Sequence, residues 1–333
     1  MKILVFEYIT GGGFNKQALP AALVAEGLLM LNGLLDGLTQ IQGVDVVVML
    51  DWRVCTSINS DGMRPCIITP DHQTLDELER LALQCDVVWP IAPEFDGILQ
   101  KLCQRIEALR KPLLTSPAKA VALTGNKWQT FQKLTQHKIA TVATQRFEDF
   151  YYQSGEWMIK AIDGAGCSDS YLVTDLNDFE LRSGQLAVNG QFIVQPHIHG
   201  EKTSLSCLFK AGRGWLLSAN VQKFNVKNQQ YHLQEILVNV TSDVSKYQRL
   251  VVEIAMVFPD LWGYVGIDLI ETADAIYVLE INPRLTTSFV AIQAALGINP
   301  CQCVLDLRVG EPLIYPQCNV PVIIKIPQDN HEI

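Results

Sequence analysis

The sequence predicts an open α/β part with a parallel sheet, followed by an α+β part built largely on antiparallel sheet. Up to about residue 115, continuous apolar strands alternate with helical stretches, which is typical of a parallel sheet covered on both faces. After residue 116, short apolar strands follow one another and are separated by turn signals. The chain of 333 residues contains no internal repeat or long linker, so we expect two domains, at 1–115 and 116–333.

In the first part, strands and helices alternate regularly. Ligands of an open α/β sheet bind at the carboxyl ends of its strands, and the segments "EYITGGG" (7–13) and "WPIAPE" (89–94) lie at such ends. The predicted strands are 2–8, 44–50, 66–69 and 85–91, and the predicted helices are about 16–38, 75–84 and 94–109.

In the second part, a helix pair with a Gly-Asn break comes first, within 116–136. Long helices recur only at about 243–258 and 288–308. The predicted strands are 140–145, 156–162, 170–175, 191–198, 203–209, 214–222, 264–271 and 276–282.

The composition excludes several classes of protein. With 48% hydrophobic and 18% charged residues, the chain is globular, and its net charge of −9 argues against a nucleic-acid binder. Glu26 and Asn32 interrupt the most apolar helix, and no apolar run reaches the roughly 18 residues that a membrane span needs. The nine cysteines lack the paired spacing of a zinc site. We expect a cytoplasmic protein with small-molecule partners and neither nucleic-acid nor membrane partners.

The segment "LEINPRLTTSF" (279–289) places polar groups in an apolar strand. Glu280 and Asn282 are two residues apart, so their side chains leave the same face of the sheet. The preceding strand carries Asp268, and a hairpin at "TADAI" would bring the three side chains together. Three oxygen ligands on adjacent strands suit magnesium. The alternative is a buried polar cluster satisfied by the backbone.

Two further segments have less specific patterns. Lys160 precedes a turn with Gly164 and Gly166, where backbone N–H groups could approach phosphate oxygens; a plain hairpin loop is the alternative. Gln195 and Pro196 end an apolar strand, which indicates a connection between strands or a hinge. His197 and His199 alternate there, but two histidines without a third ligand are more often surface residues than a metal pair.

Read in order, these segments resemble the ATP-grasp superfamily over nearly the whole chain, with a pre-ATP-grasp domain in front. The resemblance implies a nucleotide-binding subdomain at about 140–205 and a metal and catalytic part at about 206–333. It implies ATP and Mg²⁺ (or Mn²⁺) as cofactors, and an acyl-phosphate route from a carboxylate and an amine to an amide. The residues it assigns to ATP are Lys127, Lys160, Gly164, Gly166, Gln195, Pro196, His197, Ile198 and Glu201.

The same resemblance assigns the remaining roles. Asp268, Glu280 and Asn282 would hold the metal, and Arg284 with Lys160 would act on the reacting phosphate. Whether Glu201 or Lys202 contacts the ribose stays open, because alignment on Gly200 puts Lys202 where many relatives have an acid.

Within the superfamily, "VFEYITGGG" followed by "INPRLTTSF" is similar to the tyramine–glutamate ligase group of methanofuran synthesis and its relatives in methylotrophic bacteria. This implies glutamate as the carboxylate substrate, tyramine or tyrosine as the amine, and a place in one-carbon metabolism. Acids on one wall of a cleft and an arginine with hydroxyls on the other suit a zwitterion. The expected substrate residues are Glu7, Tyr8, Gly12, Glu94, Thr286, Thr287 and Ser288.

Two rival functions stay open, a kinase of the same superfamily and a nucleotide-binding regulator without turnover. Amine-dependent release of ADP separates a ligase from a kinase, and any turnover excludes the regulator. The apolar helix near residues 18–35 is either part of the core or the interface of a homodimer.

Overall fold

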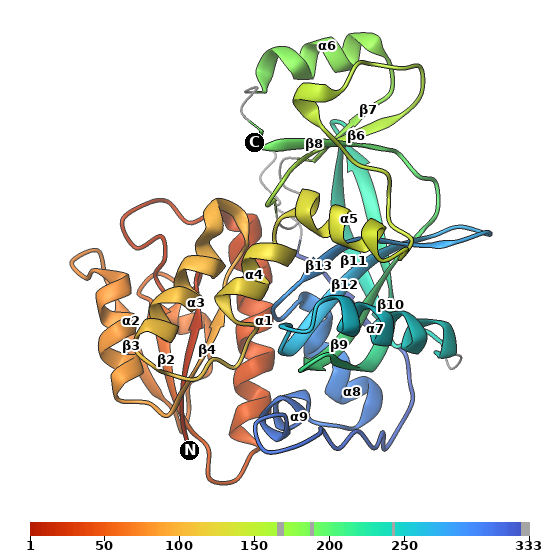
Figure 1. The fold of residues 1–333 in the computed structure, drawn as a ribbon. Helices are drawn as coiled ribbons and strands as arrows, with labels where there is room; N and C mark the ends of the chain where they lie inside the picture. The colour runs from red at the N-terminus through yellow and green to blue at the C-terminus, as the bar shows by residue number, and fades with distance from the viewer. Residues whose placement is uncertain (165–169, 187–189, 242–243, 328–333) are drawn as a thin grey trace.

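The computed structural model describes residues 1–164, 170–186, 190–241 and 244–327. Its strands form three sheets: a parallel sheet in the first part, a six-stranded sheet in the second part, and a smaller four-stranded sheet beside it (Figure 1). The predicted order, an open parallel sheet followed by antiparallel sheets, is confirmed.

The parallel sheet has the strand order β3-β2-β1-β4. Successive residues of β1 face opposite sides: Ile3 and Val5 join the cluster around α1, while Leu4 and Phe6 join the cluster under α2 and α3. This burial on both faces explains the continuous apolar strands. The strands are β1 Lys2–Glu7, β2 Asp45–Asp51, β3 Arg64–Ile68 and β4 Val87–Ile91. The helices are α1 Ala21–Thr39, α2 Thr74–Leu83 and α3 Ile98–Ala108, with single 3₁₀ turns η1 Cys55–Ser57 and η2 Phe95–Gly97.

Helix α1 begins five residues later than the sequence predicts, at Ala21 instead of Lys16. Pro20 is its N-cap, with an extended backbone, and a residue that precedes a proline is disfavoured in the helical region. Residues 8–16 form turns instead, in which the backbone N–H groups of Gly11 and Gly13 donate to the carbonyls of Glu7 and Tyr8.

The two antiparallel sheets have the strand orders β13-β12-β9-β10-β11-β14 and β5-β8-β6-β7. The strands of the larger sheet are β9 Glu201–Lys210, β10 Arg213–Lys227, β11 Gln230–Val238, β12 Gly263–Glu271, β13 Ile276–Asn282 and β14 Val322–Lys325. Those of the smaller sheet are β5 Gln145–Arg146, β6 Trp157–Ala161, β7 Ser170–Val173 and β8 Phe192–Pro196. The helices are α4 Ala118–Thr124, α5 Lys127–Gln136, α6 Leu176–Gln185, α7 Ser245–Val257, α8 Ile292–Leu296 and α9 Pro300–Asp306, with η3 Phe147–Asp149 and η4 Thr287–Ala291.

Two expectations for this part are wrong, and three further elements were not expected. The predicted strand 140–145 contributes only an isolated bridge, Thr141 to Val278, and the short β5. The predicted helix 288–308 is divided into η4, α8 and α9, because Gly297 ends α8 with a left-handed backbone (φ 66°). β11 and α6 were not expected, since their sequences mix polar and apolar residues without a clear period. β14, a short apolar run of four residues, was not expected either.

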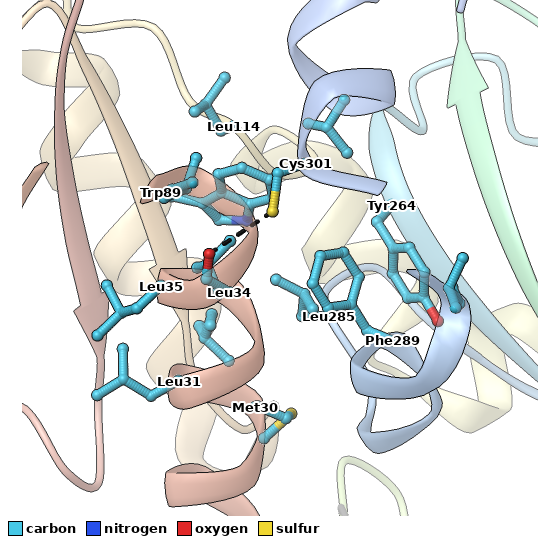
Figure 2. Close-up of a cluster of buried hydrophobic side chains, with 14 of the residues drawn as sticks. Met30, Leu31, Leu34, Leu35, Trp89, Leu114, Tyr264, Leu285, Phe289 and Cys301 are labelled. Carbon is cyan, nitrogen blue, oxygen red and sulfur yellow. Dashed lines mark hydrogen bonds between the residues drawn. The ribbon is translucent and has the colours of Figure 1, made fainter. Parts of the chain in front are cut away.

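One hydrophobic cluster joins the two parts of the chain (Figure 2). Met30 lies on the side of α1 that faces Leu285 and Phe289, whereas Leu31 and Leu35 point toward the parallel sheet. The thiol of Cys301 on α9 contacts the carbonyl of Leu34 at 3.6 Å. The apolar helix predicted to be either core or subunit interface therefore packs in the core of this chain.

Among the described residues, no single helix is long and apolar enough to cross a membrane. One bent pair, Thr287–Leu296 with Pro300–Asp306, meets the criteria of length and composition only when its two segments are joined across a 100° bend.

Candidate active site

A cavity is lined by residues of both antiparallel sheets, of α1 and of α5. It gathers most of the predicted site residues, although they come from segments more than 150 positions apart in the sequence. The predicted residues that line it are Lys127, Lys160, Gly164, Gln195, Pro196, His197, Ile198, Asp268, Glu280, Asn282, Arg284, Thr286, Thr287 and Ser288. Gly166 lies outside the described residues.

The acidic cluster of the cavity is built by the hairpin β12–β13. Asp268 pairs with Glu280 in the antiparallel register, and Asn282 pairs with Gly266 on the same hairpin. The amide of Asn282 donates to Oδ2 of Asp268 at 3.0 Å, and Gln222 of β10 donates to Oδ1 at 3.1 Å. The predicted hairpin thus brings the three side chains together.

The two carboxylates of this cluster titrate differently. Burial, and then the charge of Glu280, raise the pKa of Asp268 above its ordinary value. Burial also acts to raise the pKa of Glu280, but the charges of Lys127 and Lys160 outweigh it and hold that pKa below its ordinary value. Two acids this close need more positive charge than the lysines alone supply. A donor set of two carboxylates and an amide oxygen fits a hard divalent cation such as Mg²⁺.

Lys127 connects this cluster to the segment before the glycine turn. It is the first residue of α5, directly after the N-cap Asn126. Its Nζ lies 3.0 Å from Oε2 of Glu280 and donates to the carbonyl of Gly164 at 2.5 Å. A lysine at this point lies where phosphate oxygens would meet a cation held by Glu280.

The segment after β8 forms another wall of the cavity. The side chain of Gln195 is buried and donates to the hydroxyl of Thr144 at 3.0 Å, so it is already hydrogen-bonded within the protein. Lys202 lines the cavity with its ammonium 4.7 Å from the ring centre of Tyr231. Glu201 is exposed and does not line the cavity, which favours Lys202 as the neighbour of a ribose.

Glu94 was expected to bind substrate and Arg284 to act on the reacting phosphate, but the two side chains bind each other. Nε and Nη2 of Arg284 donate to the two oxygens of Glu94, each at 2.9 Å, and Nη1 donates to the carbonyl of Leu285. Glu94 is 7% exposed and is not part of the cavity lining, whereas Arg284 lines it. The pair fastens the end of β4 to the segment after β13.

The glycine turn after β1 also has structural contacts that the sequence did not reveal. Oε2 of Glu7, which is 1% exposed, accepts hydrogen bonds from the backbone and the hydroxyl of Thr10. Gly12 has φ 100°, and a Cβ there would lie 2.5 Å from Ile68. The ring of Tyr8 packs on Phe14. None of the three expected residues lines the cavity, because local packing and hydrogen bonding occupy them.

The hydroxyl residues after Arg284 lie in a buried network. Tyr264, Thr286 and Ser288 contact one another at 3.1–3.2 Å. Ser288 and Tyr264 also reach the hydroxyl of Ser206, at 3.0 and 2.9 Å. Hydroxyl groups donate and accept, so this wall of the cavity can adapt to a carboxylate or an amide.

Sequence reasoning missed Glu26 as a site residue. It lines the cavity from α1, and among the described residues its carboxylate has no hydrogen bond or ion pair. Burial raises its pKa, and the charge of Arg284 opposes the rise. The one indication in the sequence is the single acid in the apolar run "AALVAEGLLML". On the sequence alone, this acid argues only against a membrane span.

Known protein families match both parts of the chain. Residues 44–121 match a pre-ATP-grasp domain, and residues 124–288 match an ATP-grasp domain. Tyramine–L-glutamate ligases of Methanocaldococcus fervens and Methanocaldococcus jannaschii are each 25% identical to the chain. The matches cover 87% of this chain, and 89% and 84% of those two proteins.

Solved structures show the same fold. An ATP-grasp superfamily protein from Archaeoglobus fulgidus has a TM-score of 0.70 and 23% identity, over 98% of this chain and 92% of that protein. L-amino acid ligase from Bacillus licheniformis has a TM-score of 0.67 and 18% identity, over 95% and 78%. The family typically binds ATP with Mg²⁺. The chain belongs to the ATP-grasp superfamily.

Proposed function

We propose that this protein is an ATP- and Mg²⁺-dependent ligase that joins glutamate to tyramine or tyrosine, in one-carbon cofactor synthesis of the methanofuran type. The observation that carries the proposal is the single cavity. It combines the acids and lysines suited to MgATP with a carboxylate, Glu26, that has no hydrogen bond or ion pair within the part of the chain that the structure describes. The two relatives named tyramine–L-glutamate ligase support the choice of substrates.

The proposed reaction has two steps. A carboxylate oxygen of glutamate attacks the γ-phosphorus of ATP, and the bond to the β,γ-bridging oxygen breaks and releases ADP. The amine then attacks the acyl carbon, the C–N bond forms, phosphate leaves, and the amine loses a proton. Positioning and charge neutralisation carry a transfer of this kind. We assign these tasks to Lys127 and Lys160, together with the acids Asp268 and Glu280 and the amide of Asn282, which would hold the Mg²⁺.

Glu26 is our candidate for the amine site. An unpaired, largely buried carboxylate with a raised pKa attracts an ammonium group and can accept its proton. An amine needs that proton removed before it can attack. Glu7 and Glu94, expected from the sequence for the amine, accept hydrogen bonds from Thr10 and Arg284 instead.

The test is ADP release together with product mass. With ATP, Mg²⁺, glutamate and tyramine or tyrosine, we expect the glutamyl amide and one ADP for each product. Glu26→Gln should raise the KM for the amine at least about tenfold, the scale of one lost charge-assisted hydrogen bond, and leave the KM for ATP within a few-fold.

Asp36→Asn is the matched control, because Asp36 lies on the same helix and is exposed. If ADP release never depends on an amine, the ligase assignment fails. If another amine replaces tyramine and tyrosine, only the acceptor assignment fails.

A further inference from the structure

A cluster of three side chains lies where the smaller sheet ends, apart from the Asp268–Glu280–Asn282 cluster. His197 follows β8, His199 lies two residues further on, and Glu156 directly precedes β6. Nδ1 of His197 and Nε2 of His199 both approach the same oxygen, Oε2 of Glu156, at 2.6 and 2.9 Å. One ligand atom from each of the three side chains lies within 4.8 Å of the others. The third ligand that the sequence lacked is therefore present.

The backbone holds two of these residues in place. Glu156 and His197 stand one position beyond the register pair Trp157–Pro196 of the antiparallel strands β6 and β8. The backbone N–H of His197 donates to the carbonyl of Glu156 at 2.9 Å. The paired ends of β6 and β8 therefore fix the positions of Glu156 and His197. His199, two residues further along the chain, supplies the third side chain.

Tyr231 of β11 orients the central histidine. Nε2 of His197 lies 2.6 Å from the hydroxyl of Tyr231. When Nε2–H donates to that oxygen, the lone pair of Nδ1 points toward Glu156. A hydrogen bond at the distal ring nitrogen is the usual support of a metal-bound histidine. His197 is 8% exposed in its side chain, so this orientation is also fixed by packing.

We propose that Glu156, His197 and His199 bind a zinc-class divalent ion, with water completing a four-coordinate site. Two ligands about 2.1 Å from one ion at the tetrahedral angle are roughly 3.4 Å apart. The two histidine nitrogens lie 2.6 and 2.9 Å from the carboxylate oxygen, and all three ligand atoms lie within 4.8 Å of one another, so small side-chain movements would admit an ion. Two imidazoles and one carboxylate favour Zn²⁺, Co²⁺ or Ni²⁺ over Mg²⁺, which prefers oxygen ligands. The all-oxygen cluster of the cavity keeps Mg²⁺. His197 also lines the cavity, so the ion would stiffen the wall that contacts the nucleotide.

The experiment is a titration of the full chain, free of affinity tags, with Zn²⁺ and with Co²⁺ in millimolar Mg²⁺. We expect one equivalent to bind with micromolar affinity by calorimetry. The visible spectrum of bound Co²⁺ should be that of a tetrahedral site with nitrogen and oxygen ligands, without thiolate charge-transfer bands. His199→Gln and Glu156→Gln should each weaken binding at least about tenfold, and Tyr231→Phe should weaken it about tenfold through the lost support of His197.

His232→Gln is the matched control, since His232 is an exposed histidine on β11, and it should bind as the wild type does. Equal affinity in the wild type and in His199→Gln overturns the proposal, as does a Co²⁺ spectrum with thiolate bands in both. Circular dichroism of each variant shows that a loss of binding is not a loss of fold.

Discussion

The acids at the strand ends of the parallel sheet and the acids of the cavity differ in where their hydrogen-bond donors come from. Glu7 and Asp51 each end a parallel strand and accept hydrogen bonds from Thr10 and Arg53, only two or three residues along the chain. Asp268 and Glu280 instead face each other across a hairpin, with donors from other elements. An acid whose hydrogen-bond donors lie in the turn that follows it has a structural role. An acid placed against another acid lacks positive charge, which we propose that Mg²⁺ supplies at Asp268 and Glu280.

The largest expected effect concerns Glu280, one of the acids of the cavity. Glu280→Gln should lower turnover at least about a hundredfold, the scale of losing a charge-stabilising group, and leave the thermal midpoint without ligand nearly unchanged. Steady-state kinetics and a thermal melt measure the two quantities.

Asp274→Asn, in the exposed turn of the same hairpin, is the control. It should leave both the turnover and the thermal midpoint unchanged. Activity of Glu280→Gln within a few-fold of wild type would contradict the metal assignment. A large loss of stability would support a buried structural cluster.

The next effect concerns Glu94, an acid beyond a parallel strand whose partner lies 190 residues away. Glu94→Gln removes the charge of the one carboxylate to which the guanidinium of Arg284 is hydrogen-bonded among the described residues, and the side chain of Arg284 is 12% exposed. Breaking a buried pair in this way costs about 3–5 kcal/mol. Urea denaturation should show this loss of the free energy of unfolding, and a loss below about 1 kcal/mol would mean that the pair is open in solution.

Substitution of Asp51 should have a smaller effect, and it should lower stability and not turnover, the reverse of what we expect for Glu280. Asp51→Asn removes the charge that receives three hydrogen bonds from Arg53 and should cost about 2 kcal/mol of stability, the value of hydrogen bonds to a charged group. Turnover at saturating substrate should stay within a few-fold of wild type. A hundredfold loss of turnover with unchanged stability would place Asp51 in the active site and break the comparison.

The smallest expected effect concerns Glu271, an acid on the same strand as Asp268. Glu271 lies on β12 with Asp268, but it accepts hydrogen bonds from Lys246, Tyr247 and Thr203. Burial opposes ionisation, yet these donors outweigh it and lower the pKa of Glu271. Its contribution to stability is therefore full above the ordinary glutamate pKa, and it is lost as the pH falls through the lowered value. Unfolding free energies from pH 6 to pH 3 should fall less steeply in Glu271→Gln than in wild type; parallel curves would contradict this.

The sequence predicted the elements whose pattern is strong and local. The apolar strands of the parallel sheet, the Gly-Asn break before Lys127 and the hairpin that joins Asp268 to Glu280 are all formed. It failed where tertiary contacts decide. Strand β11 alternates irregularly and forms because β10 and β14 pair with it.

The same limit applied to the site. Glu7 and Glu26 are both single acids in apolar segments, and only the packing of α1 against the second part puts Glu26 in the cavity and leaves Glu7 outside its lining. The partner of Arg284 could not be found either, because 190 residues separate it from Glu94. Sequence reasoning identified the residues of the hairpin, but it could not tell which acids were already paired.

The close fit of α1 to the second part of the chain has an evolutionary consequence. A Cβ at Gly33 would lie 2.7 Å from Val290, and one at Gly37 would lie 2.5 Å from Sγ of Cys301, so neither position has room for a side chain at the contact drawn in Figure 2. A first part taken from another protein of the superfamily would meet this surface with the wrong side chains. We therefore expect the two parts to be inherited together, and substrate preference to change through point substitutions along the cavity wall. Position 26 is favourable for such change, because the helix that packs in the core there also lines the cavity.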